Sequence, residues 1–139
     1  MAYWLMKSEP STYSWDRLLK EGRTGWDGVR NHQAAIYLKA MKKGDRVFFY
    51  HSGESPEVVG VVEVTKEAYP DPSDASGRFV MVDVKPLKPL PKPVGLSAIK
   101  AEPALAQMLL VRQSRLSVSP VEEGHWKLIA RMGGLKGAA

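Results

Sequence analysis

Trp26 is the aromatic residue whose position most directly suggests ligand binding. It lies in a glycine-flanked loop, Gly25-Trp26-Asp27-Gly28, with no apolar residue before Val29. A large ring in a loop either covers the core from outside or lines a pocket on which a flat ligand can stack. The sequence leaves both interpretations of Trp26 open.

Polar residues also follow two apolar runs and precede one helical pattern. Lys7-Ser8-Glu9 end the first run, Tyr50-His51-Ser52 end a later one, and Asn31 stands before the helical pattern. Each has an ordinary role, because serine is common in turns, histidine is frequent in solvated loops and asparagine is a favoured N-cap. The same groups can form hydrogen bonds to a ligand. Taken alone, these residues do not decide between the two roles.

The sequence carries no recognisable catalytic or metal-binding motif. It has no cysteine, which excludes disulfides, thiol catalysis, and iron–sulfur or zinc-finger sites. His32, His51 and His125 are too scattered for a metal motif, and there is no phosphate-binding glycine-rich loop or nucleophile elbow. The sequence therefore predicts a protein that is not an enzyme and that uses no cofactor or metal.

The charge balance favours a polyanionic partner. Lys and Arg total 20 against 15 Asp and Glu, which gives a net charge of +5 and a pI near 9.5. Arg112 and Arg115 lie close together with Gln113 between them. This basic pair is either part of a solvated face or a contact for such a partner.

The length of 139 residues indicates one domain, expected over residues 1–134, with a disordered tail over 135–139. The longest unbroken apolar run, Met1–Met6, has six residues, whereas a membrane helix needs about 20. That run also lacks the features of a secretory signal. We therefore expect a cytoplasmic monomer that does not associate with a membrane.

Periodicity and capping residues predict the elements that position these groups. Strands are expected over 3–7, 46–50, 58–66 and 79–84. Ser14 can cap a helix over 15–21, and Asn31 can cap a second helix that ends at Gly44 and buries Ala34, Tyr37, Leu38 and Met41. Gly60 inside a strand suggests a bulge or a close backbone approach. The core is expected to include Trp4, Phe48 and Trp126.

The second half of the chain mixes extended and helical patterns. Residues 85–93 alternate proline with Lys and Leu, so this segment must be a sheet edge or an extended connector. A turn capped by Ser97, a helix over 103–110 and a strand over 116–118 are expected next. Ser119-Pro120-Val121-Glu122 is a capping box that predicts a last helix ending at Gly133-Gly134, with an apolar stripe of Val121, His125, Leu128, Ile129 and Met132. The order of elements predicts an α+β domain with a small, strongly bent sheet or barrel and peripheral helices.

Several long blocks of the sequence resemble the EVE domain family. They run in order along nearly the whole chain: Trp4–Pro10, Trp26–Ala34, Met41–Asp45 with Phe48–Ser52, Glu67–Asp71, Met81–Val84 and Arg115–Pro120. The resemblance implies a PUA-like fold, a small mixed β-barrel of about five to six strands flanked by short helices. Because the first block stands at the start of the chain, we expect a bacterial, stand-alone member of the family.

The resemblance also implies a function. PUA-like relatives include the YTH readers of methylated adenine in RNA, the SRA readers of methylated cytosine in DNA, and ASCH domains. The expected function is therefore a module that binds DNA or RNA carrying a modified base, with modified cytosine in DNA as the leading candidate. The modified base would enter an aromatic and polar pocket.

By similarity to the YTH pocket, individual residues can be given roles. Trp26 would be the wall on which a base stacks, Lys7-Ser8 would meet the base edge, and Asn31 would hydrogen-bond the base. Glu9 would belong to the same pocket. Tyr50-His51-Ser52 would form the opposite side. Phosphate would be met by Arg115, Arg112 and Arg30. Trp26→Ala is expected to abolish base preference and to leave the fold intact.

Two alternatives to a base reader stay open. The first is an enzyme that acts on a nucleotide or a modified nucleoside, with His51 as its acid or base. The second is a pocket for a free small molecule or a protein partner. Product formation on long incubation would reveal the enzyme, and equal affinity for a nucleoside and an oligonucleotide would favour the small-molecule pocket.

Overall fold

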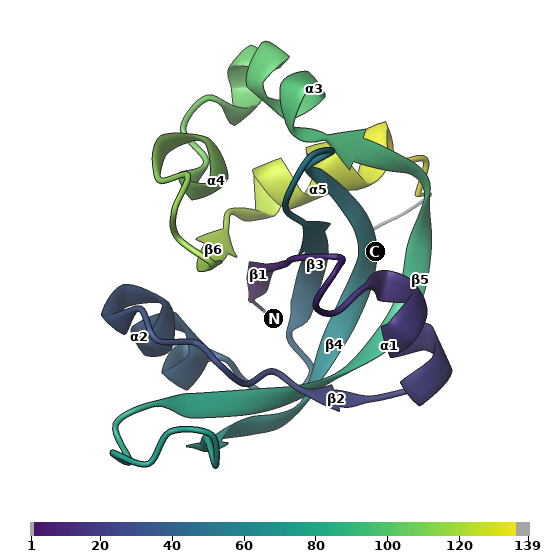
Figure 1. Cartoon of the computed structure of the whole chain (residues 1–139). Coiled ribbons are helices and arrows are strands. Elements are labelled where there is room, and N and C mark those ends of the chain that lie inside the picture. Colours follow the sequence, from purple (N-terminus) through teal and green to yellow (C-terminus); the bar gives the residue numbers. More distant parts are fainter. Residues whose placement is uncertain (1, 136–139) are drawn as a thin grey trace.

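A strongly curved six-stranded sheet forms the centre of the computed structural model, which describes residues 2–135 (Figure 1). The strands follow the order β2 (Thr24–Gly25), β5 (Val80–Gly95), β4 (Glu57–Pro70), β3 (Arg46–His51), β1 (Tyr3–Ser8) and β6 (Val118–Val121). β1 pairs with β3 in parallel, and every other neighbouring pair is antiparallel. Within residues 2–135 the outer strands β2 and β6 do not pair, so the expected mixed barrel is open on one side. The α+β prediction is confirmed.

Helices lie at both ends of this sheet. α1 (Trp15–Glu21) and α2 (His32–Ala40) flank one end, whereas α3 (Leu96–Ala101), α4 (Leu109–Arg112) and α5 (Glu123–Met132) cover the other (Figure 1). The two expected N-caps are confirmed, because Ser14 Oγ accepts from Arg17 N at 3.1 Å and Asn31 Oδ1 accepts from Ala34 N at 2.9 Å. No helix in residues 2–135 has both the length and the apolarity to cross a membrane.

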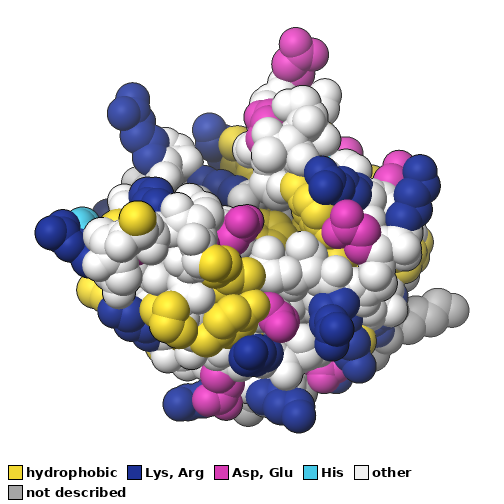
Figure 2. Space-filling model, turned by 60° about the horizontal axis from the view of Figure 1, so that its bottom comes forward, with side chains coloured by type: hydrophobic (Ala, Val, Ile, Leu, Met, Phe, Trp, Pro, Cys, Tyr) yellow, Lys and Arg dark blue, Asp and Glu magenta, His cyan; other side chains and the backbone are white. Residues whose placement is uncertain are grey.

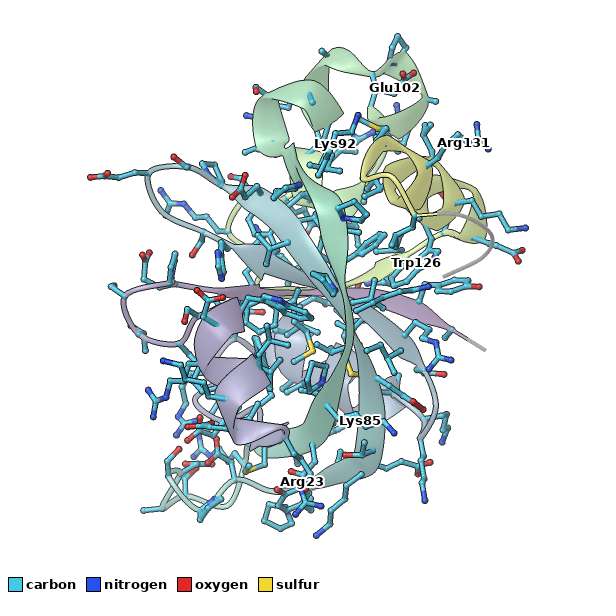
Figure 3. The ribbon with its side chains drawn as sticks, turned by 90° about the vertical axis from the view of Figure 1, so that its right-hand side faces the viewer. Arg23, Lys85, Lys92, Glu102, Trp126 and Arg131 are labelled. Carbon is cyan, nitrogen blue, oxygen red and sulfur yellow. The ribbon has the colours of Figure 1, made fainter. Side chains whose placement is uncertain are left out.

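The core has two parts because β1 and β3 are buried on both faces. Trp4 and Phe49 belong to the cluster under α1 and α2, whereas Leu5 and Phe48 face the cluster under α5. Trp126 points from α5 toward the sheet and stacks on Phe48 with ring centroids 3.7 Å apart (Figure 3). The assignment of Trp4, Phe48 and Trp126 to the core is confirmed.

Two predictions that depend on proline and glycine in strands are also confirmed. β2 pairs only with Asp83 and Val84 of β5, so the proline-rich segment 85–93 lies along a free sheet edge where missing N–H groups cost nothing. Gly60 lies at a shift in the strand register, and a Cβ there would lie 2.5 Å from the Trp15 ring. The bulge and the close approach both occur, although the approaching group is a side chain.

The capping box at residues 119–122 is a wrong prediction. Ser119 and Pro120 pair with β1 as part of β6, and α5 begins at Glu123 after Glu122, which makes no side-chain cap. Burying Ser119 in a strand ladder outweighs the local helix signal. The apolar stripe of α5 is accordingly shifted, and its buried members are Trp126, Ile129 and Ala130.

Other element boundaries differ from the sequence prediction for local reasons. α2 ends at Ala40 and not at Gly44, because the Asp45 carboxylate accepts from Lys42 N at 2.9 Å and forms a turn. The expected helix over 103–110 is split into a 3-10 turn, η1 (Pro103–Leu105), and α4, and α3 begins after Gly95 without a side-chain cap from Ser97. The strands β4 and β5 are longer than expected.

Most of the expected tail, residues 136–139, lies outside the described residues. Leu135, which was expected to belong to it, is held in place. Its N–H donates to Ala130 O at 2.9 Å, and its side chain packs against the cluster under α5.

Candidate functional site

A cavity of about 510 Å³ opens where β1 ends beside α1 and β2. It brings together four residues that the sequence analysis placed in a base pocket, namely Lys7, Ser8, Glu9 and Trp26. The remaining lining residues are Thr12, Tyr13, Arg17, Glu21, Thr24, Gly25 and Asp27. We call this space the first cavity. Apart from the Trp26 loop, its walls come from the end of β1, from α1 and from the turn that joins them.

Trp26 fulfils both interpretations that the sequence left open. The residue is only 9% exposed, and its ring packs edge-on against Phe49 with the centroids 5.4 Å apart. The backbone holds the loop in place, because Trp26 N donates to Val82 O at 2.7 Å. A Cβ at Gly25 would lie 2.1 Å from Met81 Cε, so the end of the Met81 side chain would have to move to accept a larger residue. Trp26 is therefore a core residue that also lines the first cavity.

Arg17, Tyr13 and Glu21 form a charged wall that the sequence analysis missed. Glu21 accepts from the Tyr13 hydroxyl at 2.6 Å and from Arg17 Nε at 3.2 Å. Burial and the bond to Glu21 raise the pKa of Tyr13, and bonds from Tyr13 and Arg17 lower the pKa of Glu21. The i, i+4 spacing of Arg17 and Glu21 on an expected helix was the available signal.

Lys7 and Ser8 are fixed at the end of β1. Ser8 Oγ donates to Tyr13 O at 2.5 Å, which ties the strand end to the turn before α1. Lys7 Nζ donates to Ser114 O at 2.7 Å, and burial lowers the pKa of Lys7. Because Ser114 lines a second space, Lys7 stands between two cavities.

The second cavity has a volume of about 380 Å³ and is basic. Its lining residues are Asn31, Gln33, Arg112, Gln113, Ser114, Arg115 and Leu116. The structure thus places Asn31 beside the two arginines and away from Trp26. Asn31 Oδ1 serves as the cap of α2, and the Arg112 guanidinium bonds the Gln107 side chain.

Tyr50, His51 and Ser52 do not form the expected opposite side of the first cavity, because none of them lines it. Tyr50 belongs to the cluster under α5, on the other face of the sheet. His51 Nε2 accepts from Trp15 N at 3.0 Å, and burial lowers the pKa of His51. Ser52 N donates to Ser8 O at 2.9 Å. These residues support α1 and the end of β1, which is a correction to the expected pocket.

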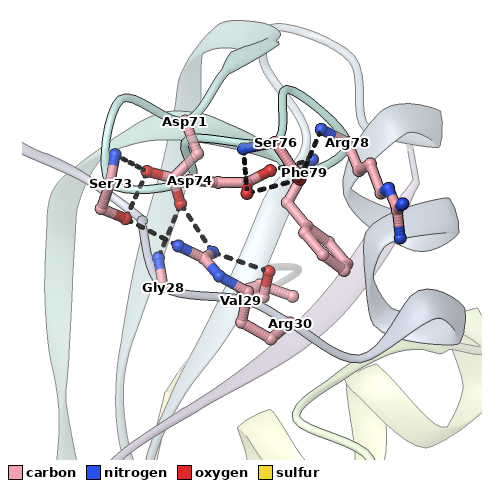
Figure 4. Close-up of polar contacts among 9 residues, drawn as sticks. All are labelled: Gly28, Val29, Arg30, Asp71, Ser73, Asp74, Ser76, Arg78 and Phe79. Atoms are coloured by element: carbon pink, nitrogen blue, oxygen red, sulfur yellow. Dashed lines mark hydrogen bonds and ion pairs between the residues drawn. The ribbon is translucent and has the colours of Figure 1, made fainter.

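Arg30, expected to meet phosphate, is engaged within the fold. Its guanidinium lies 3.2 Å from Asp71 Oδ2 and donates to Ser73 Oγ at 3.0 Å (Figure 4). Asp71 Oδ2 also accepts from Gly28 N at 2.8 Å, so the loop after β4 is bonded to the segment that follows Trp26. Burial raises the pKa of Asp71, but bonds from Ser73, Gly28 and Arg30 outweigh it and bring the pKa to about 2.

Charges of both signs surround these sites. On the face that carries α2 and β2, Lys and Arg side chains alternate with Asp and Glu and do not gather in one patch (Figure 2). In the part of the chain that the structure describes, no group of three or more His, Asp or Glu side chains could hold a metal ion. What the arrangement offers is an aromatic surface inside one cavity and two arginines in the next.

Comparison with known proteins shows the family. The EVE domain family matches residues 2–132, and the chain belongs to this family. Among similar sequences is thymocyte nuclear protein 1. The human protein is 33% identical over 162 residues, 92% of this chain and 72% of its own length. The chicken protein is 34% identical over 161 residues. That match covers 91% of this chain and 66% of the chicken protein.

Solved structures show the same fold. A protein from Rhodopseudomonas palustris is 56% identical with a TM-score of 0.93, over 99% of this chain and 96% of its own. Human THYN1 in complex with 5-methylcytosine-containing DNA is 31% identical with a TM-score of 0.89, over 99% and 100% of the two chains. The YTH domain of Zygosaccharomyces rouxii MRB1, in complex with N6-methyladenosine RNA, is 18% identical with a TM-score of 0.61. This match covers 95% of the present chain and 86% of the YTH domain chain. The last likeness concerns the fold alone. The chain therefore has the EVE-type, PUA-like α+β fold.

Proposed function

We propose that this protein is a non-catalytic module that binds nucleic acid and reads a modified base inserted into the first cavity. Modified cytosine in DNA is the leading ligand, and RNA is the alternative. The observation that carries the proposal is the anchored ring of Trp26 lining a cavity of about 510 Å³. A similar human structure in complex with 5-methylcytosine-containing DNA supports it.

The energy balance fits a base reader. Flipping a base out of a duplex costs a few kcal/mol. Stacking on an aromatic side chain returns about 1–3 kcal/mol for one base. Because Phe49 already supports Trp26 edge-on, the ring is held in place before any ligand arrives. Single-stranded substrate avoids most of the flipping cost, so it should bind more tightly than duplex.

Burial of the mark alone gives a modest preference. Burying a methyl group is worth about 0.8 kcal/mol, which is roughly a fourfold difference in affinity. A larger preference requires hydrogen bonds to the base edge, since an unpaired buried polar group costs about 1–3 kcal/mol. Ser8, Thr24 and Asp27 are polar residues that line the cavity and can provide such bonds.

The backbone of the nucleic acid would lie along the second cavity. Arg112 and Arg115 line this cavity without any carboxylate among its lining residues, which suits a phosphate group. Lys7 stands between the two cavities, at the point where the sugar of the inserted nucleotide would pass. Asn31 lies on this side, so we assign it to the backbone and not to the base edge. Arg30 is assigned to support of the Trp26 loop.

The test is a panel of short DNA and RNA oligonucleotides, each with one cytosine, 5-methylcytosine, 5-hydroxymethylcytosine or N6-methyladenine. Affinity is read by fluorescence anisotropy at low and at physiological salt. We expect at least a tenfold preference for one mark. Uniform binding that disappears at physiological salt would mean that only the basic charge acts, and the proposal would be wrong.

The matched variants are Trp26→Leu and Trp15→Leu. Both tryptophans are buried and pack edge-on against Phe49, at 5.4 and 5.5 Å between ring centroids, but only Trp26 lines the first cavity. Trp26→Leu should lose the preference, and Trp15→Leu should keep it at a similar loss of stability. If both variants keep the preference, Trp26 is not the stacking surface.

A further inference from the structure

The two cavities differ in charge. Three carboxylates line the first cavity, from Glu9, Glu21 and Asp27, against the cations Lys7 and Arg17. Two arginines and no carboxylate line the second cavity. An anionic phosphate is therefore favoured in the second cavity and disfavoured in the first. The first cavity suits a neutral group that donates hydrogen bonds.

The carboxylates of the first cavity are not equally free to bind. Glu21 is engaged by Tyr13 and Arg17. The carboxylate of Glu9 lies against the turn at Gly53, where an added Cβ would be 2.9 Å from Glu9 Oε1. Asp27 follows Trp26 directly, and its N–H donates to Gly25 O at 3.1 Å, so the chain folds tightly around Trp26. Within residues 2–135 neither the Asp27 nor the Glu9 carboxylate makes a hydrogen bond or an ion pair, and of the two only Asp27 is the direct chain neighbour of Trp26.

We propose that the first cavity selects a base that carries an exocyclic amino group, and that the Asp27 carboxylate accepts a hydrogen bond from that group. This inference rests on the proposed function and names its substrate class. An ionised carboxylate can only accept hydrogen bonds. It matches the amino group of cytosine or adenine, and it faces an oxygen when the base is thymine or uracil. With thymine or uracil, the Asp27 carboxylate and the oxygen of the base are both acceptors, so neither forms a hydrogen bond with the other.

5-Methylcytosine and thymine provide the sharpest comparison. They share the pyrimidine ring and the methyl group, and they differ in whether position 4 carries an amino group or an oxygen, with the matching change at N3. Stacking on Trp26 and burial of the methyl group are therefore the same for both. Any difference in affinity reports recognition of the base edge.

The experiment measures the affinity of the protein for single-stranded DNA that carries cytosine, 5-methylcytosine or thymine at one position. We expect 5-methylcytosine to bind at least tenfold more tightly than thymine. In Asp27→Asn the side-chain amide can donate as well as accept, so this ratio should fall below about threefold. The control is Glu123→Gln on α5, which removes the same charge outside both cavities and should keep the full ratio.

Each outcome bears on a different statement. The affinity for 5-methylcytosine can exceed that for cytosine and yet equal that for thymine. In that case the proposed function stands, and the proposal that the cavity selects an amino group is wrong. If the three oligonucleotides bind equally, this inference is wrong, and a uniform result across the wider panel of marks would show that the proposed function is wrong as well. If Asp27→Asn keeps the full ratio, or if Glu9→Gln loses it instead, Asp27 is not the acceptor.

Discussion

Replacing Asp71 with alanine should loosen the segment that carries Trp26, although Asp71 does not line the first cavity. The Asp71 side chain is fully buried and accepts from Gly28 N at 2.8 Å, Ser73 N at 2.8 Å and Arg30 Nη1 at 3.2 Å. Alanine removes the acceptor of the Gly28 and Ser73 N–H groups, which lie in partly buried hydrogen bonds, and the partner of the Arg30 guanidinium. Because the Arg30 side chain is 41% exposed and water can solvate it, we expect the free energy of unfolding to fall by about 1–3 kcal/mol, the cost of losing hydrogen bonds to a charged group.

Asp74→Ala is the matched control for this change. Asp74 lies in the same loop and accepts from Ser76 and Phe79, but it has no bond to the segment around Gly28 (Figure 4). Urea unfolding followed by circular dichroism gives the stability of each variant, and anisotropy gives its base preference. Asp71→Ala should lose more stability than Asp74→Ala and should also weaken base preference. Equal unfolding midpoints for the two variants would refute the reasoning.

The pKa of Asp71 adds a pH dependence with a definite sign. Because the folded pKa of about 2 lies below the unfolded value of 3.8, the ionised form stabilises the native state. This stabilisation is complete above about pH 4 and is lost as the pH falls toward 2. Asp71→Ala should therefore show a smaller loss of stability between pH 5 and pH 2 than the wild type, and an identical loss in the two proteins would contradict the network.

Three further predictions concern the support and the charge of the site. Gly60→Ala should cost about 1–3 kcal/mol of stability, because its Cβ would lie 2.5 Å from the rigid Trp15 ring. The stability of the wild type should fall by about 1 kcal/mol as the pH drops from above 6.5 through the lowered pKa of His51, since the protonated ring can no longer accept from Trp15 N. His51→Gln should lack this step in a urea titration. Arg115→Ala should weaken binding to all oligonucleotides alike and reduce the salt slope by about one.

Matched controls distinguish these effects from general damage. Gly124→Ala in α5 meets no atom within 4 Å and should not destabilise the protein. Arg131→Ala, which removes a cation outside both cavities, should leave the salt slope unchanged. A loss of affinity for one base only in Arg115→Ala would mean that Arg115 reads the base. The burial of Trp26 also changes one expectation, because Trp26→Ala should cost about 3–5 kcal/mol of stability in addition to base preference.

Signals carried by near neighbours in the chain predicted much of this fold. Ser14 and Asn31 cap the helices that follow them, because an N-cap needs only a side-chain oxygen and the N–H three residues later. The proline-rich segment 85–93 was expected at a sheet edge or in an extended connector, because its prolines lack the N–H groups that a central strand requires. The family resemblance is likewise a property of the sequence, and it is confirmed by the match over residues 2–132.

Distant partners give two segments a structural role that their local sequence does not indicate. Ser119 to Glu122 has the pattern of a capping box, yet pairing with β1 places Ser119 and Pro120 in a strand. His51 has the residue type of an acid or base, yet its acceptor nitrogen is engaged by the backbone of α1. In both cases the decisive partner is more than 30 residues away in the sequence, so no local pattern reports it.

The sequence, through its resemblance to a known family, predicted that Lys7, Ser8, Glu9 and Trp26 share a pocket, and all four line the first cavity. Only the tertiary structure decided that α1 provides the opposite wall and that Asn31 joins Arg112 and Arg115 in a separate cavity. The physical reason is that side chains alternate across β3, which turns Tyr50 to the other face of the sheet. The space beside Trp26 is then enclosed by α1 and the turn that precedes it.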